Sequence, residues 1–185
     1  MVFSQITNNI LIIFLGVILF VAATIDFRTQ RIPNLLTFPA AALTLIYYSI
    51  TNGLNGFLFS ALGLLVGISL FIIPYLLGGM GAGDAKLMGV VGGVLGAKGV
   101  FYAFLFSAIV GGIYAIVLTL IYRQQFRGFY KKQLAAVINF ILIRKYIPEP
   151  EDADFKKPRL CYGLAIALGT GIYIVFNLSR NGLVS

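Results

Sequence analysis

Six long apolar runs divide the chain, and they constrain its fold more than any other feature. They extend over Ile6 to Ile25, Leu35 to Ile50, Gly56 to Leu77, Leu87 to Ala97, Val100 to Tyr122 and Leu160 to Leu178. A membrane-spanning helix needs about 20 predominantly apolar residues, and 59% of the 185 residues are hydrophobic whereas only 11% are charged. The sequence therefore predicts an all-α, polytopic membrane protein with six transmembrane helices, arranged as a single membrane-embedded domain over residues 1–185.

The residue inventory excludes several kinds of chemistry. The chain contains no histidine, a single cysteine, Cys161, and six acidic residues. These counts exclude zinc clusters, internal disulfides and every catalytic dyad or triad that uses histidine. We expect neither a cofactor nor a metal ion, so any catalysis must use carboxylates, hydroxyls or amines.

Basic residues indicate the orientation in the membrane, because they accumulate in cytoplasmic loops. Arg28 and Arg31 follow the first run, Lys86 precedes the fourth, and nine more lie between the fifth and sixth: Arg123, Arg127, Lys131, Lys132, Arg144, Lys145, Lys156, Lys157 and Arg159. Placing these loops in the cytoplasm leaves only Lys98 and Arg180 outside. Both termini are then predicted on the non-cytoplasmic side of the inner membrane. The same rule accounts for the net charge of +8 without nucleic-acid binding.

The longest connection, about residues 123–158, contains a shorter apolar run at Leu134 to Ile143. About ten residues cannot cross a hydrocarbon core of about 30 Å. With basic residues on both flanks, this run predicts an amphipathic helix at the cytoplasmic interface, among the lipid headgroups. A re-entrant segment is the alternative. Four of the acidic residues also lie in this loop, where they form a solvated cluster or attract a basic peptide: Glu149, Glu151, Asp152 and Asp154.

The other two acidic residues, Asp26 and Asp84, stand at the ends of apolar runs, where a carboxylate is costly. The predicted topology brings both to the cytoplasmic face. Four glycines precede Asp84 within residues 78–83, which predicts an irregular backbone beside protein or a water-filled cavity. Two simpler interpretations remain open: Asp26 pairs with Arg28 or Arg31, and Asp84 is the N-cap of the fourth helix.

Two features concern how the helices pack. The fourth run has 11 residues and rises only about 16 Å as a helix. Either that helix continues beyond Lys98, or Asp84 lies below the headgroup level. Glycines also recur at a spacing of four, which permits close helix contact in lipid; the pairs are Gly63 and Gly67, Gly89 and Gly93, and Gly92 and Gly96.

Three segments contain distinctive motifs: Asp26 to Asn34 reads DFRTQRIPN, Gly81 to Lys86 reads GAGDAK, and Lys157-Pro158 stands shortly before Tyr162 to Ala167. The first resembles the D-x-R-x-x-x-I-P-N segment of the type IV prepilin peptidase family, and the second is similar to its GxGD-x-K motif. Lys157-Pro158 with Tyr162 to Ala167 resembles the pattern of its last span. The motifs occur in order over nearly the whole chain. The chain resembles the short, peptidase-only form associated with tight-adherence (Flp-type) pili more than the longer members, and the archaeal preflagellin peptidases remain a related alternative.

The resemblance implies an intramembrane aspartyl protease of the GxGD type with Asp26 and Asp84 as its catalytic pair. Such an enzyme cleaves the leader of prepilins or pseudopilins after a glycine at the cytoplasmic face, so its partners are a basic leader peptide and membrane lipids. Longer members carry a cytoplasmic domain with paired Cys-x-x-Cys motifs and also methylate the new N-terminus. Because this chain lacks those motifs, we expect no N-methyltransferase activity. The residues expected to support the motifs are Gly81, Gly83, Lys86, Arg28, Pro33 and Asn34.

Paired carboxylates suit this chemistry because they can share one proton, which leaves one acid and one base. Which aspartate begins as the base stays open, since the pair titrates as a unit. Lys86 either stabilises negative charge on the pair or extends to the membrane surface. Two other classes of function remain: a small transporter or channel subunit that uses Asp26 and Asp84 for protons or cations, and a non-catalytic assembly factor.

Overall fold

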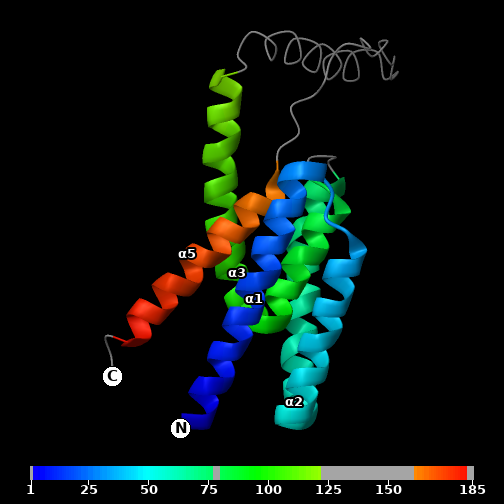
Figure 1. Cartoon of the computed structure of the whole chain (residues 1–185), viewed down its shortest axis with the longest axis vertical. Coiled ribbons are helices and arrows are strands. Elements are labelled where there is room, and N and C mark those ends of the chain that lie inside the picture. The colour runs from blue at the N-terminus through cyan, green and yellow to red at the C-terminus, as the bar shows by residue number, and fades with distance from the viewer. Residues whose placement is uncertain (1, 77–79, 122–160, 183–185) are drawn as a thin grey trace, which may run out of the picture. The chain divides into compact units, whose positions relative to one another are not determined.

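The structure, a computed structural model, describes residues 2–76, 80–121 and 161–182, and all regular structure in these ranges is helical (Figure 1). The helices are α1 (Val2–Thr29), α2 (Asn34–Leu76), α3 (Ala82–Ile121) and α5 (Tyr162–Gly182). All four are long and apolar enough to cross a membrane. The prediction of an all-α, multi-pass membrane protein is therefore confirmed. The loop at 123–158, with its predicted interfacial helix, lies outside the described residues.

Contacts along the chain divide it into two units. The first contains Met1–Gly112 and Cys161–Ser185. The second contains Ile113–Leu160, of which the structure describes only the last turns of α3. All contacts discussed below lie within the first unit.

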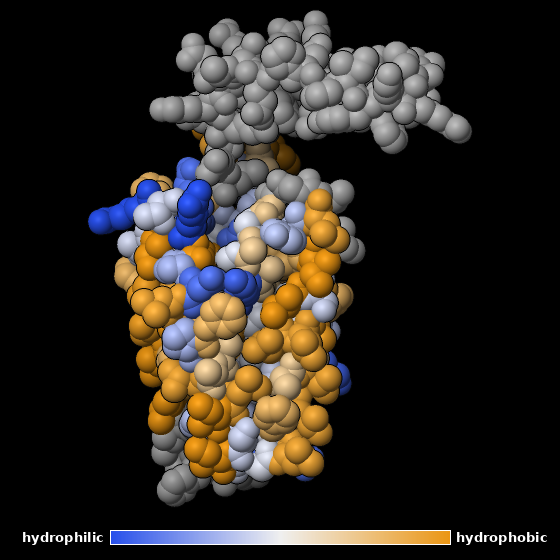
Figure 2. Space-filling model, turned by 90° about the vertical axis from the view of Figure 1, so that its right-hand side faces the viewer, coloured by the Kyte–Doolittle hydropathy of each residue, from blue (hydrophilic) through white to orange (hydrophobic). Residues whose placement is uncertain are grey.

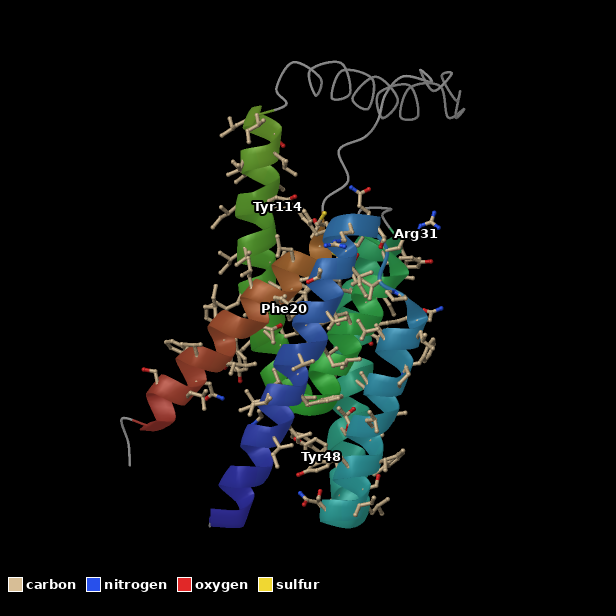
Figure 3. The ribbon with its side chains drawn as sticks, in the orientation of Figure 1. Phe20, Arg31, Tyr48 and Tyr114 are labelled. Atoms are coloured by element: carbon tan, nitrogen blue, oxygen red, sulfur yellow. The ribbon has the colours of Figure 1, made fainter. Side chains whose placement is uncertain are left out.

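Helix α2 reverses direction at Gly53. Its 43 residues would extend about 65 Å as one straight helix, roughly twice the thickness of a membrane core. The backbone leaves helical geometry at Gly53, with φ 58° and ψ −141°, a conformation that glycine adopts readily. Beyond it the chain doubles back (Figure 1). The ring of Tyr48, labelled in Figure 3, lies 5.1 Å from that of Phe59.

Helix α3 reverses in the same way at Gly96, where φ is 72° and ψ is 175°. Its returning part brings the Phe104 ring to 5.4 Å from that of Phe71. The helix that begins at Ala82 thus ends before Lys98, and the alternative of a continuous helix through Lys98 is wrong. With the two breaks, the described residues form six helical segments that correspond to the six apolar runs.

Glycines allow the second half of α2 to lie directly against the first half of α3. A Cβ atom added at Gly63 would collide with the carbonyl group of Gly92, and one added at Gly92 would collide with that of Gly63. One turn away, Gly67 faces the carbonyl of Met88 in the same way. The two backbones are therefore in contact, as the four-residue glycine spacing predicts.

We expect Gly92→Ala to destabilise the protein, because its methyl group has no room against the α2 backbone. Overpacking of this kind costs roughly 1–3 kcal/mol. The matched control is Gly112→Ala in the returning part of α3, where an added Cβ meets nothing within 4 Å. Thermal unfolding in detergent should show a lower Tm for Gly92→Ala and no loss for Gly112→Ala. Equal Tm values would contradict the close packing.

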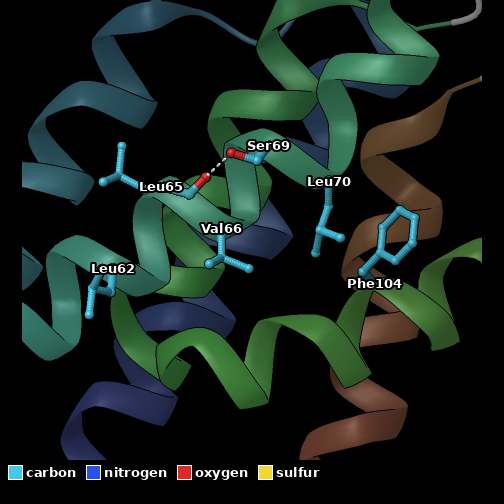
Figure 4. A pocket seen from close by; sticks show the side chains of 6 residues that line it. All are labelled: Leu62, Leu65, Val66, Ser69, Leu70 and Phe104. Carbon is cyan, nitrogen blue, oxygen red and sulfur yellow. Dashed lines mark hydrogen bonds between the residues drawn. The ribbon is translucent and has the colours of Figure 1, made fainter.

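A pocket of about 450 Å³ opens between α2 and the returning part of α3 (Figure 4). Its lining is almost entirely apolar and consists of Leu62, Leu65, Val66, Ser69, Leu70 and Phe104. The Ser69 hydroxyl donates to the Leu65 carbonyl oxygen at 2.7 Å, so the one polar side chain of the lining is already bonded. None of the lining residues is a candidate site residue.

Candidate active site

Asp26 lies in the last turn of α1 and points toward the start of α5. Its side chain is 5% exposed. The Gly163 N–H of α5 donates to its Oδ2 atom at 2.8 Å, and its main-chain carbonyl oxygen lies 3.9 Å from the Cys161 Sγ atom. The first N–H groups of a helix have no partner within that helix. Asp26 therefore caps α5 from a different helix.

Asp84 lies in the first turn of α3 and caps its own helix. It is 8% exposed, and its Oδ2 atom accepts the Gly81 N–H at 3.0 Å. Gly81 directly precedes the helix, so Asp84 occupies the third helical position, from which an acidic side chain reaches back to the N-cap. The interpretation of Asp84 as the N-cap is therefore wrong, because Gly81, three residues earlier, occupies that position. The expected irregular backbone is also absent at Ala82 and Gly83, which are helical.

The two carboxylates converge although 58 residues separate them in sequence. Asp26 lies near enough to Asp84 for the two carboxylates to interact electrostatically, and Tyr162, at the start of α5, lies near enough to Asp84 for its hydroxyl to do the same. Each carboxylate accepts a backbone N–H at its Oδ2 atom. Three helices, α1, α3 and α5, thus meet at a buried pair of aspartates.

The basic residues near Asp26 lie at the protein surface, whereas Asp26 itself is buried. Arg28 and Arg31 are exposed, and in the described residues the recorded partner of the Asp26 carboxylate is the Gly163 N–H. Gln30 follows the helix with φ 53° and donates its N–H to the Asp26 carbonyl oxygen at 2.8 Å. The simpler interpretation of Asp26 as a surface ion pair therefore gains no support.

The motif residues Pro33, Asn34 and Lys86 lie where the start of α2 meets the first turn of α3. Pro33 precedes α2, and its carbonyl oxygen accepts the Leu36 N–H at 3.1 Å, which forms a turn at the start of this helix. The preceding residue, Ile32, is buried against Gly83. Asn34 accepts a hydrogen bond from the Lys86 ammonium at 2.7 Å. The two motifs, distant in sequence, thus contact each other.

Sequence reasoning did not assign site roles to Gly163 and Tyr162. Both lie in the segment that resembles the last-span pattern of the family, and that resemblance was the available signal. The resemblance does not show which residue Gly163 contacts, because Gly163 and Asp26 lie 137 positions apart. In the described residues no three His, Cys, Asp or Glu side chains gather as a metal site would require.

These features define a class: multi-pass helical membrane proteins with a buried pair of aspartates where three helix ends meet. The sequence matches the family model described as "Type IV leader peptidase family" over residues 13–116, which include both Asp26 and Asp84. The chain therefore belongs to the type IV leader peptidase family.

Two curated relatives are similar to part of the chain. It is 37% identical over 120 residues to a prepilin leader peptidase/N-methyltransferase of Bacillus subtilis strain 168, covering 58% of this chain and 44% of the relative. It is 34% identical over 107 residues to the protein of the same description in Vibrio cholerae, covering 52% and 41%. The chain thus matches less than half the length of either relative. No solved structure matches it.

Proposed function

We propose that the protein is a prepilin leader peptidase. It acts as an intramembrane aspartyl endopeptidase that cleaves the leader of type IV prepilin-like proteins after a glycine, at the cytoplasmic face of the membrane. The observation that carries the proposal is the buried Asp26 and Asp84 pair, each held by a backbone N–H at a helix end. Family membership and the description of both relatives as prepilin leader peptidases support the substrate class.

The proposed mechanism uses the pair as acid and base. The ionised carboxylate takes a proton from a water molecule, whose oxygen attacks the scissile carbonyl carbon. The protonated carboxyl group donates a hydrogen bond to the developing oxyanion. The carbon–nitrogen bond then breaks, and the leaving nitrogen receives a proton from the pair. The backbone N–H groups of Gly163 and Gly81 hold the two Oδ2 atoms, and in the proposed mechanism the other oxygen of each carboxylate contacts the water.

The proposed topology has six membrane spans, both termini outside and the site at the cytoplasmic face. The distribution of polar side chains supports it. On the face shown in Figure 2, hydrophobic residues cover the lower part and most hydrophilic ones gather in the upper part, toward the end where Figure 3 labels Arg31. Arg31 follows the end of α1 that carries Asp26. A transporter that uses the pair at mid-membrane would instead need carboxylates in the middle of helices.

We attribute leader cleavage alone to these 185 residues. Methylation in the longer members is associated with paired Cys-x-x-Cys motifs, and a chain with one cysteine cannot form them. The expected partner is a prepilin or pseudopilin with a basic leader, presented to the site from the lipid bilayer.

The test is a cleavage assay in membranes. The chain is co-expressed with a prepilin whose basic leader ends in glycine, and the pilin mass is measured. We expect a loss of mass equal to that of the leader. A prepilin with leucine in place of that glycine is the control and should stay intact. No cleavage across a panel of prepilins from tight-adherence and other type IV systems, with the chain shown to be inserted, would contradict the proposal.

A further inference from the structure

Lys86 connects two helix starts beside the site. It lies on α3, two residues after Asp84, and is partly buried. Its Nζ atom donates to the Asn34 Oδ1 atom at 2.7 Å and lies 5.0 Å from the centroid of the Phe38 ring. Asn34 and Phe38 are one turn apart on α2, so their side chains lie on the same face. The lysine therefore reaches from α3 to the first turn of α2.

A second contact lies on the other side of Asp84. Ile32 is 8% exposed, and a Cβ atom added at Gly83 would come within 3.0 Å of the Ile32 Cβ atom. The segment from Ile32 to Asn34 therefore covers the first turn of α3 and is attached to it at both ends. Asp84 is the residue between these two attachments, at positions 83 and 86.

Both recorded partners of the Lys86 ammonium are neutral groups, an amide oxygen and an aromatic ring. A charged donor makes a stronger hydrogen bond than a neutral one, and a cation over a ring face adds attraction. The amine is thus engaged in a structural contact that requires a long cationic side chain.

We propose that Lys86 is a positioning residue, which ties the start of α2 to the first turn of α3 and thereby fixes the place of Asp84. This inference rests on the proposed peptidase function. Asp84 is held by the N-cap of its helix, and the first turn of a helix lacks part of the internal hydrogen bonding. The hydrogen bond from Lys86 to Asn34 links that turn to the start of α2. It thereby keeps the Asp84 carboxylate in place relative to Asp26.

The test is a double-mutant cycle of Lys86→Met and Asn34→Ala, with cleavage measured per inserted molecule. Small misplacements of a catalytic group lower the rate by about 10- to 100-fold, so each single variant should lose that much in kcat with little change in KM. The double variant should be no worse than either single one, because both remove the same contact. Asn34→Asp keeps an oxygen acceptor for the lysine and should retain activity close to that of the wild type.

The pH profile of cleavage distinguishes this role from a direct effect of the Lys86 charge on the carboxylates. We expect Lys86→Met to lower kcat without displacing the profile. A displaced profile for Lys86→Met, together with full activity for Asn34→Ala, would overturn the proposal. The matched control is Lys98→Met, which removes an exposed lysine just after the break at Gly96 and should leave cleavage unchanged.

Thermal unfolding of the same variants tests the contact between Lys86 and Asn34 without any substrate. Each single variant should lower the Tm, and the double variant should lower it by less than the sum. Additive losses would overturn the contact. If the wild type cleaves no prepilin, the proposed function fails while the unfolding cycle still reports on the contact. If the unfolding effects are coupled but kcat is unchanged, Lys86 is structural only and the positioning role is wrong.

Discussion

Asp26→Asn and Asp84→Asn should each abolish leader cleavage while leaving the fold intact. Asparagine keeps the shape of the side chain and one oxygen, which can still accept the Gly163 or the Gly81 N–H. It cannot act as an acid or a base. General acid–base catalysis contributes about 100- to 10,000-fold, and we expect each variant to lose activity at least in that range.

The double variant should be no less active than the single ones. A pair that shares one proton acts as a unit, so removal of either member removes its whole contribution. The measurement is cleavage of a prepilin by equal amounts of inserted wild-type, single and double variants. Unchanged thermal unfolding of the variants is the control for folding. Full activity in a well-inserted Asp26→Asn or Asp84→Asn protein would rule out the two-aspartate mechanism.

The convergence of Asp26 and Asp84 could be predicted from the sequence because it follows from the topology. Apolar runs of membrane length leave few possible paths for the chain, and two runs that enter from the same side bring their ends to the same face. The contact of Gly63 with Gly92 could be anticipated for a similar reason. Four-residue glycine spacing has few uses in a lipid environment other than close packing.

The local conformation around Asp84 was harder to predict because two physical effects compete there. Glycines favour an irregular backbone, yet Asp84 reaches back to the Gly81 N–H and so stabilises a helix that begins at Ala82. The outcome depends on one side-chain hydrogen bond, which composition does not reveal. Similarly, the sequence contains 21 glycines, and composition does not show that the chain reverses at Gly53 and Gly96 rather than at others.

The start of α5 is the part of the site that neither spacing nor composition could identify. Gly163 donates to Asp26 across 137 residues of sequence, and α5 lies outside the range that matches the family model. A Cβ atom at Gly163 would come within 2.9 Å of the Asp26 Oδ2 atom and 3.1 Å of its Cγ atom. A glycine at this position therefore lets the carboxylate approach the helix end.

Gly163→Ala should consequently lower cleavage strongly while sparing the fold. The alanine keeps the N–H, but its methyl group displaces the Asp26 carboxylate by a few tenths of an ångström or more from its place against the N–H. Misplacement on this scale lowers the rate by about 10- to 100-fold. Alanine also favours helix over glycine by roughly 0.5–1 kcal/mol, so loss of folding cannot account for the effect if the Tm stays near that of the wild type.

Gly171→Ala provides the matched control, because it makes the same change on the same helix where an added Cβ meets nothing within 4 Å. We expect this variant to cleave at the wild-type rate with an equal or higher Tm. The comparison requires kcat/KM per inserted molecule for both variants. Similar rates for Gly163→Ala and Gly171→Ala would show that Asp26 does not depend on the end of α5. A selective loss in Gly163→Ala would make α5 a third element of the catalytic site, with Gly163 placing the carboxylate that α1 supplies.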